Sequence, residues 1–329
     1  MGSSTQPKLP IIDLSLKSLN LNSSSWVTKC DEVRCALEEY GCFIALYDGV
    51  SRELRDATFL ALQELFSLPA EVKAKNISDT PYNGYIGQLP MVPLYESLGI
   101  DDATTTEGTE SFTKLMWPSG NQSFSESVVM FSKSVAELDQ IVMKMVTASY
   151  GIEEPYETIR GSTTYLLKPT KYLRPQGNEK TLGVYPHTDK SFMTYLHQDE
   201  VNGLEIKTKG GEWIEVDYTP SSFVVMAGGA FMAWTNGRIE APTHRVMMSG
   251  DKDRYVLGLF VSIKDHIIQV PQKLVDEDHP LQFHAFDHYK YMHFYHTDEG
   301  IKCKTAIVLH QTTKRYDNVT QALTRAARH

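Results

Sequence analysis

The chain has 329 residues, of which 41% are hydrophobic and 22% charged, and this composition is typical of a globular protein rather than a disordered one. The 41 Asp and Glu residues outnumber the 32 Lys and Arg residues, which gives a formal net charge of −9. Because an acidic chain repels phosphate backbones and anionic membranes, we expect neither nucleic-acid binding nor membrane attachment.

Residues 1–160 are predicted to be mostly helical after a short strand in LPIIDLS. Val33, Leu37 and Tyr40 fall at i, i+4 and i+7, as one buried helix face requires, and Gly41 ends that helix. A longer helix is predicted to end at Gly151, because its apolar residues repeat at steps of three and four: Val128, Phe131, Val135, Leu138, Val142 and Met145.

The period changes to two from about residue 161 to 265. Eight short stretches there are rich in β-branched and aromatic residues: TTYLLK, FMTYLHQ, GLEIKT, EWIEV, SFVVMAG, FMAWTN, HRVMM and RYVLGLFVSI. Their number and spacing favour a sandwich or barrel, most simply a jelly roll with flanking helices. Trp213 and Trp234 are expected on strands in its core. The remaining residues, 266–329, are mixed, with a weakly helical segment near 283–299 and a basic tail.

We expect one unit over residues 1–329, since no repeat or long linker divides the chain. The four cysteines match neither a zinc site nor a disulfide framework, and the N-terminus lacks the apolar region of a secretory signal. A cytoplasmic location follows as a prediction.

Two histidines and an aspartate form the most informative chemical pattern. His187 and Asp189 share one face if they lie in a strand, and His244 begins another predicted strand. Two imidazoles and one carboxylate form a facial triad, which leaves metal positions open and suits Fe(II) and oxygen chemistry. The alternative is that H-x-D is an ordinary surface loop or strand end.

Arg254 begins the predicted strand RYVLGLFVSI. At period two it shares a face with Val256, Gly258, Phe260 and Ser262. If that face lines an enclosed space, the guanidinium needs an anion, and a dicarboxylate that also reaches the metal would supply one. Pairing with one of the chain's own acidic residues is the alternative.

The sequence resembles the Fe(II)/2-oxoglutarate-dependent dioxygenases of plants from about residue 8 to 300. The resemblance is carried by PHTDKSFMTYLHQDEVNGLEIKTKGGEWIEV, FMAWTNGRIEAPTHRV and DRYVLGLF, and near the N-terminus by LPIIDLS and EEYGCFIALYDGV. Further stretches are most similar to the branch named for alkenyl- and hydroxyalkyl-glucosinolate formation: GYIGQLPMVPLYESLGID, TKLMWPSGN, VPQKLVDEDHPLQF and FDHYKYMHFY.

This resemblance implies a double-stranded β-helix (jelly-roll) core with His187, Asp189 and His244 as iron ligands. It implies that Arg254 binds the distal carboxylate of 2-oxoglutarate, that O2 is consumed, and that ascorbate serves as reductant. Succinate and CO2 would form while a small plant specialised metabolite is hydroxylated, desaturated or dealkylated.

Val256 departs from the family pattern Arg-x-Ser, because valine cannot donate the hydrogen bond that the serine gives to the distal carboxylate. Loss of such a bond typically costs about 1.5–3 kcal/mol. We therefore expect weaker 2-oxoglutarate binding unless Tyr165, Thr170 or Tyr172 supplies a hydroxyl, and Val256→Ser should lower the apparent constant.

The substrate pocket is expected at the mouth of the barrel. Its candidate residues are Phe192, Phe260, Tyr95, Phe112 and Met116, all of which would serve equally well in a core. Four nearby histidines alternate with aromatic residues and lack zinc spacing, so we expect packing or surface roles for His284, His288, His293 and His296.

Two other functions remain open because of Val256. One is a jelly-roll protein that binds a small molecule with weak or no catalysis. The other is an iron oxidase that uses another co-reductant. The intact triad argues against the first and Arg254 argues against the second. Nothing in the sequence identifies the substrate or a protein partner.

Overall fold

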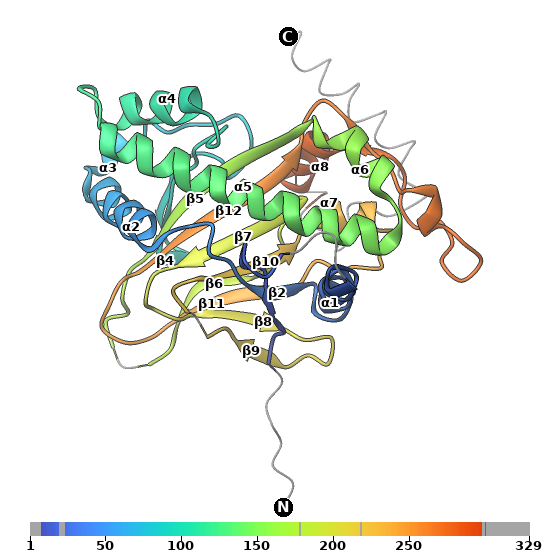
Figure 1. Cartoon of the computed structure of the whole chain (residues 1–329). Coiled ribbons are helices and arrows are strands. Elements are labelled where there is room, and N and C mark those ends of the chain that lie inside the picture. The colour runs from blue at the N-terminus through green and yellow to red at the C-terminus, as the bar shows by residue number, and fades with distance from the viewer. Residues whose placement is uncertain (1–7, 20–23, 178, 218, 298–299, 301–329) are drawn as a thin grey trace, which may run out of the picture.

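The computed structural model describes residues 8–19, 24–177, 179–217, 219–297 and 300. It has three layers: helices, a large sheet and a small sheet (Figure 1). The basic tail predicted from residue 301 onward lies outside the described residues. Among those residues no helix is both long and apolar enough to cross a membrane.

The large sheet has eight strands in the order β1-β2-β10-β7-β12-β5-β4-β3. Their bounds are Ile11–Asp13 for β1, Cys42–Leu46 for β2, Ile86–Leu89 for β3, Val92–Ser97 for β4, Thr163–Tyr172 for β5, Met193–Gln198 for β7, Ser222–Ala227 for β10 and Arg254–Ile263 for β12. All neighbouring strands pair antiparallel except β1 and β2, which are parallel. The N-terminal region therefore contributes strands to the same sheet as the predicted core.

The small sheet has the order β6-β11-β8-β9. Its strands are β6 (Thr181–His187), β8 (Leu204–Lys207), β9 (Trp213–Glu215) and β11 (His244–Met248). A separate pair joins β13 (Ile267–Ile268) to β14 (Phe286–Asp287). The two larger sheets enclose a second apolar cluster that includes Ile44, Ile206 and Val246, as expected for a jelly roll.

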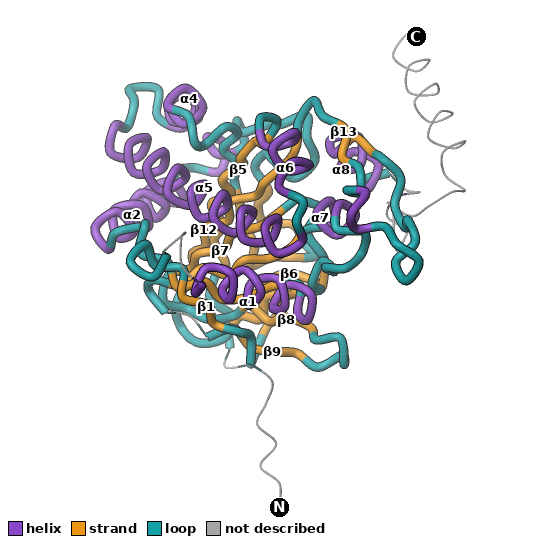
Figure 2. The backbone as a smooth tube through the Cα atoms, turned by 45° about the vertical axis from the view of Figure 1, so that its right-hand side comes forward, coloured by secondary structure: helices purple, strands orange, loops and turns teal. Residues whose placement is uncertain are grey.

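Helices cover the other face of the large sheet (Figure 2). They are α1 (Ser24–Tyr40), α2 (Arg52–Ser67), α3 (Ala70–Lys73), α4 (Thr106–Met116), α5 (Gln122–Tyr150) and α6 (Glu153–Arg160). The two helices predicted from spacing are confirmed as α1 and α5, and both end at a glycine with positive φ, Gly41 and Gly151.

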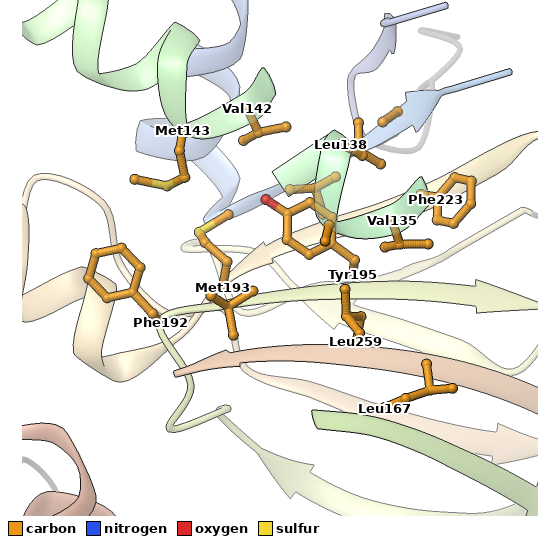
Figure 3. Close-up of a cluster of buried hydrophobic side chains, with 14 of the residues drawn as sticks. Val135, Leu138, Val142, Met143, Leu167, Phe192, Met193, Tyr195, Phe223 and Leu259 are labelled. Atoms are coloured by element: carbon orange, nitrogen blue, oxygen red, sulfur yellow. The ribbon is translucent and has the colours of Figure 1, made fainter. Parts of the chain in front are cut away.

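The main core lies between α5 and this sheet. Val135, Leu138 and Val142 of α5 point toward Tyr195 of β7 and Leu259 of β12 (Figure 3). Every second residue of β12 thus packs under the helices, and the alternate residues, which include Arg254, are free to face the small sheet.

The stretch FMAWTN is not a strand, contrary to the sequence prediction. Residues Gly229–Trp234 form the short helix α7, which also carries Trp234. Trp213 lies on the strand β9 as expected, but it is half-buried and not part of the core. Helix and strand cannot be told apart from the period of a short apolar run when nearly all of its residues are buried. Here the helix begins directly after Gly228. The sequence pattern does not predict the strand β6, because its residues are mostly exposed or half-buried and lack an apolar alternation.

After Pro271 come the 3-10 helix η1 (Gln272–Leu274) and helix α8 (His288–Tyr295), which confirms the weakly helical segment predicted there. No metal-binding group of three or more ligand residues involves the four histidines of this region among the described residues. His288 is buried and hydrogen-bonded, as its packing interpretation predicted.

Candidate active site

Two histidines face each other across neighbouring strands of the small sheet. His187 is the last residue of β6, His244 is the first of β11, and their Cα atoms are partners in the antiparallel ladder. Directly opposite residues point to the same side of a sheet. The two imidazole rings accordingly lie with their centroids 4.2 Å apart.

Asp189 completes the group from a loop rather than from a strand. It follows the end of β6 by two residues, so the strand geometry predicted for His187 and Asp189 is wrong, although the two side chains do meet. Its Oδ1 lies 3.8 Å from Nε2 of His187 and 3.7 Å from Nε2 of His244. Ligand atoms of all three residues lie within 4.8 Å of one another, so these residues form a group that could hold one metal ion.

Hydrogen bonds at the rear of each side chain fix its orientation. The Nδ1–H groups of His187 and His244 donate to the carbonyl oxygens of Tyr185 and Pro242, at 2.8 and 3.2 Å, since a carbonyl can only accept. This tautomer leaves both Nε2 lone pairs directed at the centre. Thr194 donates its hydroxyl to Oδ2 of Asp189 at 2.7 Å, a role that no sequence motif signalled.

The electrostatic state of these groups suits a divalent ion. Partial desolvation by the surrounding groups lowers the pKa of His187 to about 4, although 42% of its side chain is exposed, and the neighbouring His244 adds to this effect, so the ring is neutral at neutral pH. Burial alone would raise the pKa of Asp189, but the positive charge that His244 and His187 carry when protonated, the hydroxyl of Thr194 and the ammonium group of Lys190 together hold that pKa below its ordinary value. Two imidazoles and one carboxylate are a donor set that suits Fe(II) and leaves positions open for further ligands.

The loop 188–192 that carries Asp189 is held by its neighbours. The N–H of Gly229 donates to the carbonyl of Asp189 at 2.8 Å, and a Cβ on Gly228 would collide with the carbonyl oxygen of Ser191. From α8, His288 donates through Nε2 to the carbonyl of Lys190 at 2.8 Å, while its Nδ1 accepts from the N–H of Ile263. Segments distant in sequence therefore position the carboxylate.

Arg254 is buried and faces the same space between the sheets. Its guanidinium donates to Oε1 of Gln198 at 2.6 Å and to the carbonyl of Val201 at 3.1 Å, and both are neutral groups. In the part of the chain that the structure describes, it forms no salt bridge with a carboxylate. Burial lowers the pKa of Arg254 to about 10, so the side chain is still a cation at neutral pH.

The strand opposite Arg254 supplies two of the three predicted hydroxyl groups. Tyr172 is the direct ladder partner of Arg254, whose guanidinium carbon is 5.3 Å from the centre of the tyrosine ring. Thr170 is the direct partner of Val256. Tyr165 lies seven residues from Tyr172 on β5, and its hydroxyl instead donates to Oδ2 of Asp139 at 2.9 Å.

A cavity of about 740 Å³ joins the triad to Arg254. Its floor is formed by the inward faces of β5 and β12, and this confirms the face predicted for Arg254. The strand residues in this floor are Thr164, Leu166, Lys168, Thr170 and Tyr172 on β5, and Arg254, Val256, Gly258, Phe260 and Ser262 on β12.

The predicted pocket residues divide into two groups. Tyr95 and Phe260 line the cavity. Phe192, Phe112 and Met116 do not: all three are buried in the main core, Phe192 against Phe231 and the other two on α4. Sequence alone could not separate these groups, because a large apolar side chain suits a core as well as a pocket wall.

Comparison with known families identifies two matching segments. Residues 164–263 match the 2OG-Fe(II) oxygenase superfamily, and residues 9–93 match the family described as the N-terminal region of non-haem dioxygenases in morphine synthesis. The first segment contains the triad and Arg254.

Individual relatives extend over almost the whole chain. A probable 2-oxoglutarate-dependent dioxygenase of Arabidopsis thaliana, AOP1.2, is 42% identical over 307 residues, which are 91% of this chain and 94% of the relative. The Arabidopsis thaliana dioxygenase for auxin oxidation 1, solved as a binary complex with 2-oxoglutarate, is 27% identical with a TM-score of 0.75, covering 83% of this chain and 100% of that one. JOX2, solved with 2-oxoglutarate, Fe and JA, is 25% identical with a TM-score of 0.74, covering 88% and 85%.

Proposed function

The chain belongs to the 2OG-Fe(II) oxygenase superfamily, and from that premise we propose that His187, Asp189 and His244 hold its iron. The protein is a 2-oxoglutarate-dependent dioxygenase that acts on a small molecule of plants. The observation that carries the site assignment is the convergence of two oriented Nε2 atoms and one carboxylate at the wall of the cavity that also contains Arg254. When bound, the iron supplies the redox chemistry that couples conversion of 2-oxoglutarate to succinate and CO2 with oxidation of the substrate.

Arg254 is proposed to bind the distal carboxylate of 2-oxoglutarate. A buried guanidinium without a carboxylate partner among the described residues is costly unless an anion occupies its site. Gln198 and the carbonyl of Val201 take up two of its donor groups and so orient the remaining ones toward the cavity. Tyr172 lies beside the guanidinium on the same cavity wall, where its hydroxyl can reach the same anion.

Several finer parts of the function also belong to this proposal. O2 is the oxidant, ascorbate is the reductant that keeps the iron ferrous, and the chain works as one dioxygenase unit in the cytoplasm. The shared large sheet supports a single unit, because strands of the N-terminal region pair with those of the core. Nothing in the site favours the binding-protein or oxidase alternatives that Val256 left open.

An anaerobic titration tests the site assignment. Fe(II) and then 2-oxoglutarate are added to the metal-free protein, and the weak visible charge-transfer band of the chelate is recorded. We expect the band in the wild type, its loss in His187→Ala, and a higher 2-oxoglutarate requirement in Arg254→Met.

The matched control is His279→Ala, which removes an exposed histidine paired with Asp276, far along the chain from the triad. It should leave the band unchanged. Iron binding that survives His187→Ala, or a band that does not depend on Arg254, would contradict the assignment.

A further inference from the structure

Three ring-bearing side chains in contact with one another, Tyr82, His296 and Tyr295, line one part of the cavity and are called the aromatic arch below. Tyr82 packs edge-on against His296 with centroids 4.4 Å apart, and His296 in turn contacts Tyr295 at the end of α8. One lysine lies beside each end of this arch. Nζ of Lys168 is 5.9 Å from the ring centre of Tyr82, and Nζ of Lys190 is 4.0 Å from the ring centre of Tyr295. All five side chains line the cavity.

Neither ammonium group of the arch has a carboxylate within salt-bridge distance in the described ranges of the chain. Nζ of Lys190 donates to the carbonyl oxygen and to Oγ1 of Thr188, at 2.9 and 2.6 Å. Nζ of Lys168 donates to the carbonyl of Tyr82 at 2.8 Å. Because an ammonium group has three donors, each lysine keeps capacity for a ligand in the cavity.

The charged side chains around the cavity do not cancel. Four are basic and three are acidic, so their formal sum is one positive charge: Lys168, Lys190, Arg254 and Lys264 against Asp101, Asp102 and Asp189. Fe(II) adds two positive charges and 2-oxoglutarate two negative ones, which leaves the sum unchanged. The loaded cavity of a chain with a net charge of −9 is therefore cationic, as a site for an anion would be.

These charges have different partners in the loaded site. Arg254 and Asp189 are matched by 2-oxoglutarate and iron under the proposed function, and Lys264 acts electrostatically on Asp101. Lys190 acts electrostatically on Asp189, but the proposed iron takes up that carboxylate, so Lys190 and Lys168 are left as the cations without a carboxylate of their own. Lys190 and Asp189 both line the cavity and act on each other electrostatically, so an anion bound at Lys190 lies near the proposed iron site.

We propose that the oxidised substrate is an organic anion whose charged group pairs with Lys190 beneath the aromatic arch. This inference rests on the proposed function. Lys168, beside Tyr82 at the other end of the arch, strengthens the positive potential of the cavity and attracts the anion. The apolar part of the substrate lies against Leu166, Phe260 and Met292, which line the same cavity.

A pair of fluorescent dyes tests this proposal. Anilinonaphthalene sulfonate and N-phenylnaphthylamine share one aromatic skeleton and differ in the anionic group. The protein is first loaded with Mn(II) in place of Fe(II) and with saturating 2-oxoglutarate, so that Arg254 and the metal are occupied. We expect Lys190→Met to weaken binding of the sulfonate dye about tenfold or more and to leave binding of the neutral dye unchanged.

Lys168→Met should weaken sulfonate binding less, and Lys190→Arg should retain it because the charge remains. Lys252→Met is the matched control: it also removes one positive charge, but from an exposed lysine paired with Glu200, and should have no effect. Equal effects of Lys190→Met on both dyes, or no saturable sulfonate binding, would overturn the proposal. Binding of 2-oxoglutarate is measured by dialysis in the same samples. If the protein does not bind 2-oxoglutarate, the result counts against the proposed function rather than against the role of Lys190.

Discussion

The residue opposite Val256 on the neighbouring strand is a threonine, Thr170, which carries the hydroxyl group that Val256 lacks. Val256 and Thr170 are opposite each other in the β5–β12 ladder. The pair Arg254 and Tyr172 lies two residues further along the same two strands, and all four residues line the cavity. Opposite residues have Cβ atoms about 4.5–5.5 Å apart. The hydroxyl of Thr170 can thus reach the carboxylate that a serine at position 256 would bind. Among the described residues, this hydroxyl donates one hydrogen bond, a long one of 3.5 Å to the carbonyl oxygen of Lys168.

This arrangement predicts coupling between the two positions. Thr170→Val should raise the dissociation constant of 2-oxoglutarate about tenfold or more, because a hydrogen bond to a charged group is lost. Val256→Ser should restore affinity in that background and improve it less when Thr170 is present. Anaerobic 2-oxoglutarate titrations of the wild type, both single variants and the double variant give the coupling.

Thr164→Val is the matched control, since Thr164 lies on the same strand and face but six residues from Thr170. Its 2-oxoglutarate affinity should equal that of the wild type. Unchanged affinity in Thr170→Val would show that the threonine hydroxyl has no part in binding and that the sequence-based expectation of weak binding stands.

At the scale of elements, the triad depends on contacts between segments that are far apart in the chain. The two histidines are fixed by the β6–β11 ladder, but Asp189 is fixed by the start of α7, where Gly228 and Gly229 approach the loop 188–192. A glycine is required at position 228 because any Cβ there would meet the carbonyl of Ser191.

We therefore expect Gly228→Ala to displace the loop and to weaken metal binding about ten- to hundredfold, as loss of outer contacts to a metal ligand typically does. Calorimetric titration with Mn(II) measures this, with circular dichroism to verify that the protein is folded. Gly161→Ala is the control: nothing lies within 4 Å of its added Cβ and its φ is −65°, so its metal affinity should not change. Equal affinities in both variants would show that the loop tolerates the collision.

At the scale of the whole molecule, one buried carboxylate joins the helical layer to the large sheet. Asp139 of α5 accepts hydrogen bonds from Tyr165 of β5 and Tyr195 of β7, each at 2.9 Å. Burial raises the pKa of Asp139 to about 6, although the two tyrosine hydroxyls act in the opposite direction. The folded state therefore holds this proton more tightly than the unfolded state does.

Because the folded pKa lies above the unfolded value, this group stabilises the fold at low pH, and the contribution is lost as pH rises through about 6. A shift from 3.8 to about 6 corresponds to roughly 3 kcal/mol. Asp139→Asn cannot ionise, so the wild type should lose about 2 kcal/mol in free energy of unfolding relative to this variant between pH 4 and pH 7. Urea unfolding of both proteins at each pH measures this difference, and parallel pH profiles would contradict it.

How much could be predicted from sequence depended on whether a feature is local. The helices α1 and α5 were predictable because their apolar residues repeat along the chain and a glycine ends each. The inward face of β12 was predictable from period two. The stretch around α7 was not, since its six residues are too few to reveal a helical period and nearly all of them are buried.

The sequence by itself determined the family, the jelly-roll class and the residue types of the candidate site, because the H-x-D, the later histidine and the arginine are readable wherever they lie. Tertiary structure alone decided which groups surround them: Thr194 behind Asp189, Thr170 opposite Val256, and Lys190 under Tyr295. It also placed Phe192 in the core and Phe260 in the cavity. These are contacts between residues of different elements, and strand pairing and helix packing, rather than local pattern, bring them together.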